Sequence, residues 1–262
     1  MQVTKQFVAN CAECGVILNN FQEKPTNQYD FLGVQFNHQR SGTWVRARPL
    51  TVEKLQQKIF LNISHPTLRQ CLGTFGQLVW LSLIQRIPLS EFSICYKFLR
   101  RRVGWNLDAK CNVWRCSIGE WEKWHARAAG NTWRKVSESN VIATHLFSDA
   151  SLSGFGAVAF RSDESVAVTA GMWSDEEKTK HINILETLAV VRAVNTLDMD
   201  TNIHLHIDNT TALFSIRRGR SNNFHTNNCI KFLQHCGNIL LSVEYVKSAE
   251  NPADPFSRID FN

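Results

Sequence analysis

The sequence predicts an α/β protein: a mixed five-stranded sheet with flanking helices, preceded by a helical region. Before about residue 140, apolar residues recur at helical spacing; after Val141, short strands and helices follow in the order βββαβααβα. The charge divides at the same place. Residues 1–140 hold 19 Lys and Arg against 9 Asp and Glu (+10), and residues 141–262 hold 10 against 14 (−4), which sum to the net +6.

The composition excludes several classes of protein. Of the 262 residues 44% are hydrophobic and 20% charged, which is typical of a globular protein and not of a fibre or a disordered tail. No run of eighteen apolar residues predicts a membrane span, and the first residues do not resemble a signal peptide. We therefore expect an intracellular protein, cytoplasmic or nuclear, that is not secreted. The eight scattered cysteines favour reduced thiols over a disulfide framework.

The first half predicts one strand and several helices. Residues 27–36 are typical of a strand that ends a hairpin, and residues 51–63 predict a helix with Thr51 as its N-cap. His65-Pro66 ends that helix, and Thr67 caps a second one that stops before Pro88.

Two further helices are expected before a polar linker over residues 129–140. One covers residues 90–102 and ends in a basic cluster, and the other covers residues 110–128. Five of the eight Trp lie between Trp105 and Trp133, and they indicate a packed helical core, with stacking on bases as the alternative.

The second half predicts an antiparallel meander and then helices alternating with strands. The three strands of the meander are VIATHLFSD, GFGAVAF and ESVAVTAGMW. Ser174 and Glu177 form a capping box for a helix that runs to about Leu197. The later elements are a strand NIHLHID, helices near 209–217 and 225–236, a strand LLSVEYV and a short helix in ADPFSR.

Four carboxylates stand at element boundaries or on a buried stripe of this half. Asp149 closes the first strand, Glu186 lies one turn after Ile182 on an apolar helix face, Asp208 closes the fourth strand, and Asp254 begins the last helix. Such groups repel one another when they converge, and divalent cations remove the repulsion. Two metals ~4 Å apart would also clamp the attacking and leaving oxygens of a phosphodiester.

These segments resemble a known family. FSDASLSGFGAV, INILETLAVVRAV, LHIDNTTAL and YVKSAENPADPFSR are similar to the four successive motifs of the retroelement ribonuclease H domain. The resemblance implies that Asp149, Glu186, Asp208 and Asp254 are the catalytic residues and hold two Mg²⁺ ions, with Mn²⁺ as the alternative. It assigns one metal, which activates water, to Asp149 and Asp254, and the other to Asp149, Glu186 and Asp208.

The rest of the chain resembles a reverse transcriptase. NPADPFSR is similar to the N-x-x-A-D-x-L-S-R ending of gypsy-type and DIRS-type (tyrosine-recombinase) retroelements, and KPTNQYDFLGVQFN resembles the end of a palm whose F-L-G strand, here Phe31, Leu32 and Gly33, forms the primer grip. LTVEKLQQKI and LRQCLGTFGQLVWL resemble a thumb. The implied division is 1–50 for the end of the palm, 51–140 for thumb and connection, and 141–262 for a ribonuclease H-like domain.

The resemblance implies a metal-dependent endonuclease that cleaves the RNA strand of RNA·DNA hybrids. No adjacent pair of aspartates precedes Phe31, so we expect this chain to lack the polymerase active site and to need palm and fingers in cis or in trans. The alternative is a host-captured, catalytically silent protein with a nucleic-acid-binding or structural role; a cleavage product is also compatible with the sequence.

Further residues are expected to contact nucleic acid. The resemblance places short polar groups around the metals, here Ser151, Asn209 and Thr210, although Asn209 is also a possible helix cap. Two arginine clusters suit a phosphate backbone, and for the second cluster, which follows the Asp208 helix, a solvated turn is the alternative. Their members are Arg100, Arg101, Arg102, Arg217, Arg218 and Arg220.

Two local features depart from common patterns. Cys11-x-x-Cys14 has no second pair at zinc-finger spacing, so we expect structural thiols. Residues 247–250, Lys-Ser-Ala-Glu, stand where many cellular ribonucleases H carry a mobile histidine.

Overall fold

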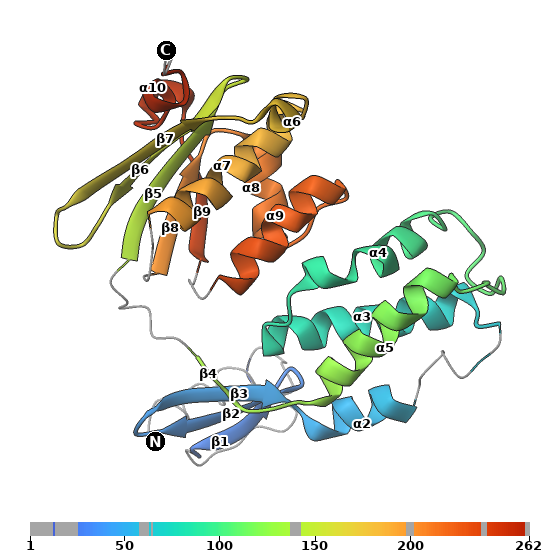
Figure 1. Ribbon diagram of the computed structural model, residues 1–262. Helices are drawn as coiled ribbons and strands as arrows, with labels where there is room; N and C mark the ends of the chain where they lie inside the picture. Colours follow the sequence, from blue (N-terminus) through green and yellow to red (C-terminus); the bar gives the residue numbers. More distant parts are fainter. Residues whose placement is uncertain are drawn as a thin grey trace.

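The computed structural model describes residues 26–57, 65–136, 143–197, 202–236 and 240–259, together with Glu13 and Ile63 (Figure 1). The Cys11–Cys14 pattern lies outside these ranges, as do parts of the expected helix 51–63 and linker 129–140. Each of two sheets is accompanied by its own set of helices. Among the residues that the structure describes, none of the helices could span a membrane.

The first sheet has the order β1-β2-β3-β4 and is antiparallel. Its strands are β1 (Gln28–Phe31), β2 (Val34–Gln39), β3 (Gly42–Ala47) and β4 (Arg134–Lys135). The single strand expected over residues 27–36 is therefore wrong, because the chain reverses at Leu32 and Gly33, whose φ angles are 48° and 80°. A Cβ at Gly33 would lie 3.0 Å from the Trp80 ring, so both the turn and the packing favour glycine here.

Helices follow this hairpin: α2 (Pro49–Gln57), α3 (Leu68–Gln85), the 3₁₀ helix η2 (Leu89–Phe92), α4 (Ser93–Arg100) and α5 (Arg115–Ala129). The predicted cap at Thr67 is confirmed, and it forms a capping box with Gln70. The predicted N-cap at Thr51 is wrong. This residue lies inside α2, which begins at Pro49, a residue whose fixed φ suits the first helical position.

Two helix boundaries also differ from the prediction. The helix expected over residues 90–102 is divided into η2 and α4, because Glu120 accepts hydrogen bonds from the backbone N–H groups of Ile94 and Cys95 and so caps α4 separately. The helix expected from residue 110 begins only at Arg115, since Lys110 pairs as a β-bridge with Thr67 and the preceding segment is extended.

A core of aromatic and aliphatic side chains holds these helices together. Trp121 and Trp124 are fully buried in it. The Trp124 ring stacks on Phe92 at 4.4 Å, and its Nε1–H donates to Ser82 Oγ at 2.7 Å. The prediction that this tryptophan-rich segment forms a helical core is confirmed for these two residues, and neither is available to stack on a base.

The second sheet contains β5 (Ala143–Ala150), β6 (Gly154–Phe160), β7 (Val166–Met172), β8 (Asn202–Ile207) and β9 (Leu240–Tyr245). Its order is β7-β6-β5-β8-β9; β6 is antiparallel to both neighbours, and β8 is parallel to β5 and β9. The predicted α/β fold with a mixed five-stranded sheet is confirmed.

The flanking elements are α6 (Asp175–Lys178), α7 (Ile182–Thr196), α8 (Thr210–Arg217), α9 (Phe224–His235), the 3₁₀ helix η3 (Ser248–Glu250) and α10 (Asp254–Ser257). The single helix expected from Ser174 to Leu197 is two helices. The predicted capping box of Ser174 and Glu177 is present but closes only α6, and His181 caps α7 by accepting a hydrogen bond from Asn183 N–H.

Strand alternation decides which face of the second sheet the helices cover. Leu146 of β5 and Leu205 of β8 are fully buried in a core that includes side chains of α7, α8 and α9. The short helix α10 packs at one end of β5, β6 and β7 (Figure 1). Because β5 and β8 are parallel, their carboxyl ends meet at one edge of the sheet.

Contacts also join the two parts of the chain. Asn227 of α9 is buried, and its Nδ2 donates to the Ser90 carbonyl in η2 at 2.8 Å. The Arg220 guanidinium lies 3.8 Å from the centre of the Tyr96 ring in α4. The helical part therefore packs against the α8–α9 side of the second sheet.

Candidate metal centre

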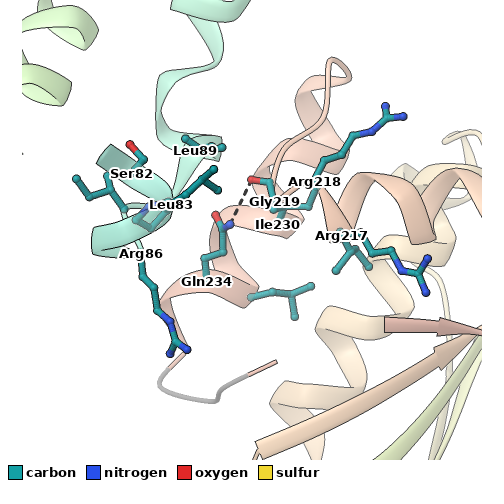
Figure 2. A pocket seen from close by; sticks show the side chains of 13 residues that line it. Ser82, Leu83, Arg86, Leu89, Arg217, Arg218, Gly219, Ile230 and Gln234 are labelled. Atoms are coloured by element: carbon teal, nitrogen blue, oxygen red, sulfur yellow. Dashed lines mark hydrogen bonds between the residues drawn. The ribbon is translucent and has the colours of Figure 1, made fainter. Parts of the chain in front are cut away.

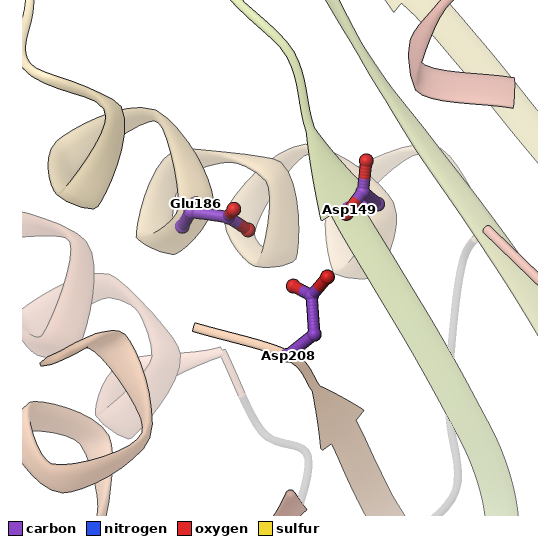
Figure 3. Close-up of side chains that lie close together, drawn as sticks. All are labelled: Asp149, Glu186 and Asp208. Atoms are coloured by element: carbon purple, nitrogen blue, oxygen red, sulfur yellow. The ribbon is translucent and has the colours of Figure 1, made fainter. Parts of the chain in front are cut away.

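Three carboxylates meet at the edge where β5 and β8 end. Asp149 lies near the end of β5, Asp208 directly follows β8, and Glu186 lies in the second turn of α7 (Figure 3). One ligand oxygen of each lies within 4.8 Å of the others. Asp149 and Glu186 are buried and Asp208 is half-buried, so the cluster is accessible from the Asp208 side.

Burial and mutual repulsion make these groups resist ionisation. Burial is the main cause that raises the pKa of Glu186 to about 9, and the charges of Asp149 and Asp208 add to it. Burial is also the main cause that raises the pKa of Asp149; the charges of Asp208 and Asp254 raise it further, while the hydrogen bond of Ser257 and the charge of Arg258 lower it. The protein interior alone therefore does not stabilise three negative charges at this point.

Two oxygens of the cluster are left without a partner. Asp149 Oδ2 and Glu186 Oε2 are fully buried and accept no hydrogen bond from the residues that the structure describes. Such oxygens cost free energy unless a donor or a cation meets them. A donor set made only of carboxylate oxygens suits hard divalent cations such as Mg²⁺ or Mn²⁺. The three side chains therefore fit a divalent cation.

The fourth predicted ligand lies beside this group rather than in it. Asp254 begins α10 as predicted, and its charge raises the pKa of Asp149. Both of its oxygens accept from Arg258: Nη2 donates to Oδ1 at 2.7 Å, and Nε donates to Oδ2 at 3.2 Å. Asp254 is thus paired with a cation from its own chain.

Close packing fixes the position of α10. Asn251 is buried, and its Nδ2 donates to the Ser148 carbonyl of β5 at 3.1 Å. A Cβ at Gly156 of β6 would lie 2.5 Å from the backbone N of Ser257, so only glycine allows α10 to approach the sheet this closely. Asp254 is consequently held next to the end of β5.

Sequence reasoning assigned no role to Asn251, Ser257 or Arg258. Asn251 anchors α10, the Ser257 side chain hydrogen-bonds to Asp149, and Arg258 pairs with Asp254. All three stand inside the segment NPADPFSR, so the motif that identified Asp254 also contained the signal for its neighbours.

The short polar residues expected to contact nucleic acid have different surroundings. The Ser151 hydroxyl donates to the Ser257 carbonyl at 2.6 Å and accepts from Gly154 N–H, so it is already used within its turn. Asn209 is the N-cap of α8, accepting from Ala212 N–H at 2.9 Å. Thr210 is exposed beside it.

The Asn209 amide also has a partner. Its Nδ2 donates to Asn183 Oδ1 at 3.0 Å. Asn183 lies one turn before Glu186 in α7, so the pair joins two of the elements that carry the carboxylates. The cap interpretation of Asn209 is therefore correct, and contact with nucleic acid stays a prediction.

The arginines after Asp208 are not equivalent. Arg217 Nε donates to the Val243 carbonyl of β9 at 2.7 Å, and Arg218 is exposed with its guanidinium 5.8 Å from the Phe214 ring. The Arg220 guanidinium is stacked on Tyr96 between the two parts of the chain, and its role in gripping phosphate stays a prediction.

The first arginine cluster is divided in the same way. Arg100 and Arg101 are exposed. Arg102 is buried, and its guanidinium donates to the carbonyls of Phe98 and Asn112. The Arg102 guanidinium is therefore used within the helical core, and its contact with nucleic acid stays a prediction.

A cleft of about 520 Å³ separates the end of α3 from α8 and α9 (Figure 2). Arg86, Arg217 and Arg218 line it, but Arg217 and Arg218 point away from its centre (Figure 2). The predicted primer-grip residues lie elsewhere: Phe31, Leu32 and Gly33 form the β1–β2 turn of the first sheet, apart from the second sheet whose edge carries the carboxylates (Figure 1).

Comparison with known proteins gives similarity in solved structures only. No protein-family model matches the chain, and no curated protein sequence matches it. The chain is similar to ribonuclease H1 from the halophilic archaeon Halobacterium salinarum NRC-1, with a TM-score of 0.35 and 16% identity over 44% of this chain and 92% of that one. It is also similar to the foamy viral protease-reverse transcriptase in complex with an RNA/DNA hybrid, with a TM-score of 0.33 and 10% identity over 90% of this chain and 31% of that one.

Another foamy viral structure, the protease-reverse transcriptase in complex with double-stranded DNA, has a TM-score of 0.34 and 13% identity over 85% of this chain. This chain spans 45% of that protein, less than half of its length.

Proposed function

We propose that this chain is a divalent-metal-dependent endonuclease that cleaves the RNA strand of RNA·DNA hybrids. The observation that carries the proposal is the buried cluster of Asp149, Glu186 and Asp208, with two carboxylate oxygens that have no hydrogen-bond partner in the described structure. A purely structural protein gains nothing from such a cluster, since each unpaired buried oxygen destabilises the fold. The cluster argues against the alternative of a silent, host-captured protein.

The proposed ligands are Asp149, Glu186 and Asp208 for one cation, and Asp149 with Asp254 for a second. Bound there, Mg²⁺ or Mn²⁺ would stabilise the charge that develops on the phosphate and lower the pKa of the attacking water. The chain's own residues hold this geometry: α7 and the two parallel strands fix three carboxylates, and Asn251 anchors the helix that carries Asp254. Water attack at phosphorus then releases the 3′-oxygen of the RNA strand.

We further propose that the chain is the thumb, connection and ribonuclease H region of a gypsy-like or DIRS-like retroelement reverse transcriptase. The motif resemblances support this assignment, as does a helical part between the β1–β2 hairpin and the second sheet. In this proposal residues 1–50 end the palm, residues 51–140 form thumb and connection, and residues 141–262 form the ribonuclease H-like domain. Palm and fingers would come from elsewhere in cis or in trans.

One assay tests the proposed activity. The full chain is incubated with end-labelled RNA, either in a hybrid with DNA or in a duplex with RNA, with Mg²⁺, with Mn²⁺ or with a chelator. We expect metal-dependent cleavage of the RNA in the hybrid only. Absence of cleavage in every metal, with normal binding of the hybrid, would instead favour the silent nucleic-acid-binding protein.

A further inference from the structure

The fourth carboxylate differs from the other three in its electrostatic partner. Asp149 and Glu186 each keep a buried oxygen without a partner, whereas both oxygens of Asp254 accept hydrogen bonds from Arg258. The pair spans positions i and i+4 around the end of α10. Arg258 therefore supplies the positive charge next to Asp254 that the proposed cation between Asp149 and Asp254 would otherwise supply.

The charge of Arg258 reaches the rest of the cluster. The hydrogen bonds and the charge of Asp254 are the main causes that raise the pKa of the guanidinium, and the charges of Asp149 and Asp208 raise it further. A positive charge at this place lowers the repulsion among the carboxylates as long as no metal is bound. It becomes unfavourable when a divalent cation binds beside it, because the two positive charges then repel each other.

We propose that Arg258 is a built-in counter-ion that holds Asp254 in the metal-free protein and competes with the cation that uses this carboxylate. The inference rests on the proposed function and adds an order of events to it. A cation at Asp149, Glu186 and Asp208 finds one oxygen of Asp149 and one of Glu186 without a partner among the described residues. A cation at Asp149 and Asp254 binds only when Arg258 releases at least one oxygen of Asp254.

The geometry makes release feasible. The Arg258 side chain is 65% exposed and that of Asp254 is 26% exposed, so the guanidinium can leave toward solvent without opening the core. Pairs with this exposure contribute modestly to stability, which makes the competition weak enough to be overcome by a divalent cation. Asp254 itself stays in place after release, because Asn251 and the contact at Gly156 hold α10.

The test is calorimetric titration of Mn²⁺ into the full chain without nucleic acid. Arg258→Gln removes the competing charge, and we expect its dissociation constant for Mn²⁺ to be about two- to fivefold lower than that of the wild type. Arg258→Lys keeps the charge but loses the two-pronged pairing, so its value should lie between the two. Arg192→Gln is the matched control, since Arg192 pairs with Glu177 outside the cluster, and it should leave the constant unchanged.

A double variant separates competition from any general effect on the fold. With Asp254→Asn already present, Arg258→Gln should change Mn²⁺ binding much less than it does in the wild-type background, because the carboxylate for which arginine and metal compete is gone and only the repulsion between the guanidinium and the cation remains. The thermal midpoint of each metal-free variant shows whether folding has changed.

The outcomes are distinct. If the wild type binds Mn²⁺ and Arg258→Gln binds it equally well or more weakly, the inference is overturned but the proposed metal centre stands. An effect of Arg258→Gln that is as large in the Asp254→Asn background as in the wild-type background also overturns it. If the wild type binds no Mn²⁺ at all, the proposed metal centre fails together with the inference.

Discussion

Asp149 and Glu186 lie in one buried cluster, and each keeps one carboxylate oxygen without a hydrogen-bond partner among the described residues. They come from different elements: Asp149 from β5 of the second sheet, and Glu186 from α7, which packs against this strand. In the part of the chain that the structure describes, neither carboxylate forms an ion pair with an arginine or lysine, whereas Asp254 pairs with Arg258. The cluster is therefore a place where the metal-free fold carries a cost that a bound cation removes.

The metal-free protein should lose stability as the pH rises from about 5 to 8.5. Glu186 has a pKa of about 9 in the folded protein against an ordinary 4.5, so between these values the folded state binds more protons than the unfolded state. The free energy of unfolding then decreases with rising pH. In Glu186→Gln this contribution disappears, which urea unfolding in a chelator at several pH values would measure.

Wild type and Glu186→Gln are compared at each pH, so groups that titrate in both proteins cancel. His206 is one of these: burial lowers its pKa, which by itself increases stability as the pH rises through 6.5. If the two proteins show the same dependence on pH, Glu186 is ionised in the folded protein at neutral pH and the repulsion argument fails.

Asp208→Asn should abolish cleavage and leave the metal-free fold equally stable or more stable. The change removes one negative charge that raises the pKa values of Asp149 and Glu186, so repulsion falls. It also removes a proposed metal ligand, whose contribution to charge stabilisation in the transition state amounts to several kcal/mol. Hybrid cleavage and the thermal midpoint are measured on the same sample, and wild-type activity would contradict the site assignment.

Substitutions at Asn209 should separate helix capping from contact with nucleic acid. Asn209→Ala loses the bond to Ala212 N–H and should cost ~1 kcal/mol in the free energy of unfolding. Asn209→Asp keeps the cap, but it loses the amide donor to Asn183 and places a charge next to the carboxylates. Slower hybrid cleavage by Asn209→Asp at an unchanged melting temperature indicates a role in the site; unchanged cleavage and unchanged preference over duplex RNA mean that Asn209 is only a cap.

The polar contact between the two parts of the chain should contribute to stability. Asn227→Ala leaves the Ser90 carbonyl and the Ser221 N–H without their partner, which costs about 1–3 kcal/mol for a buried group. Differential scanning calorimetry would show a lower midpoint, or two transitions where the wild type has one. Asn228→Ala, at the neighbouring exposed position of α9, is the control; equal midpoints would show that the two parts do not support each other.

Arg100 and Arg101 should act on nucleic acid, whereas Arg102 should act on folding. Replacing both exposed arginines with glutamine should make the slope of log K against log salt less steep by about 1.8, at about 0.9 per phosphate contact. Arg102→Gln loses its bonds to Phe98 and Asn112 and should lower the thermal midpoint. Fluorescence anisotropy with a labelled hybrid at several salt concentrations measures this slope. An unchanged slope in the double variant would remove Arg100 and Arg101 from the proposed binding surface.

The sequence alone determined the position of the strands of the second sheet and of most helices that flank it. Alternating and helical apolar patterns follow directly from which face of each element is buried. It failed where tertiary contacts choose between alternatives. Glu120 divides the helix expected over residues 90–102, and the Gly33–Trp80 contact accompanies a turn where one strand was expected. Local periodicity contains no information about these distant partners.

The same division applies to the candidate site. The motifs located Asp149, Glu186, Asp208 and Asp254 by residue type and position, since strand ends and a buried helix stripe are visible in a linear pattern. Only the folded chain decided that three of them share one group while the fourth is paired with Arg258. Packing likewise buried Arg102 and left Arg100 and Arg101 exposed, because charge is encoded residue by residue but burial depends on everything that surrounds it.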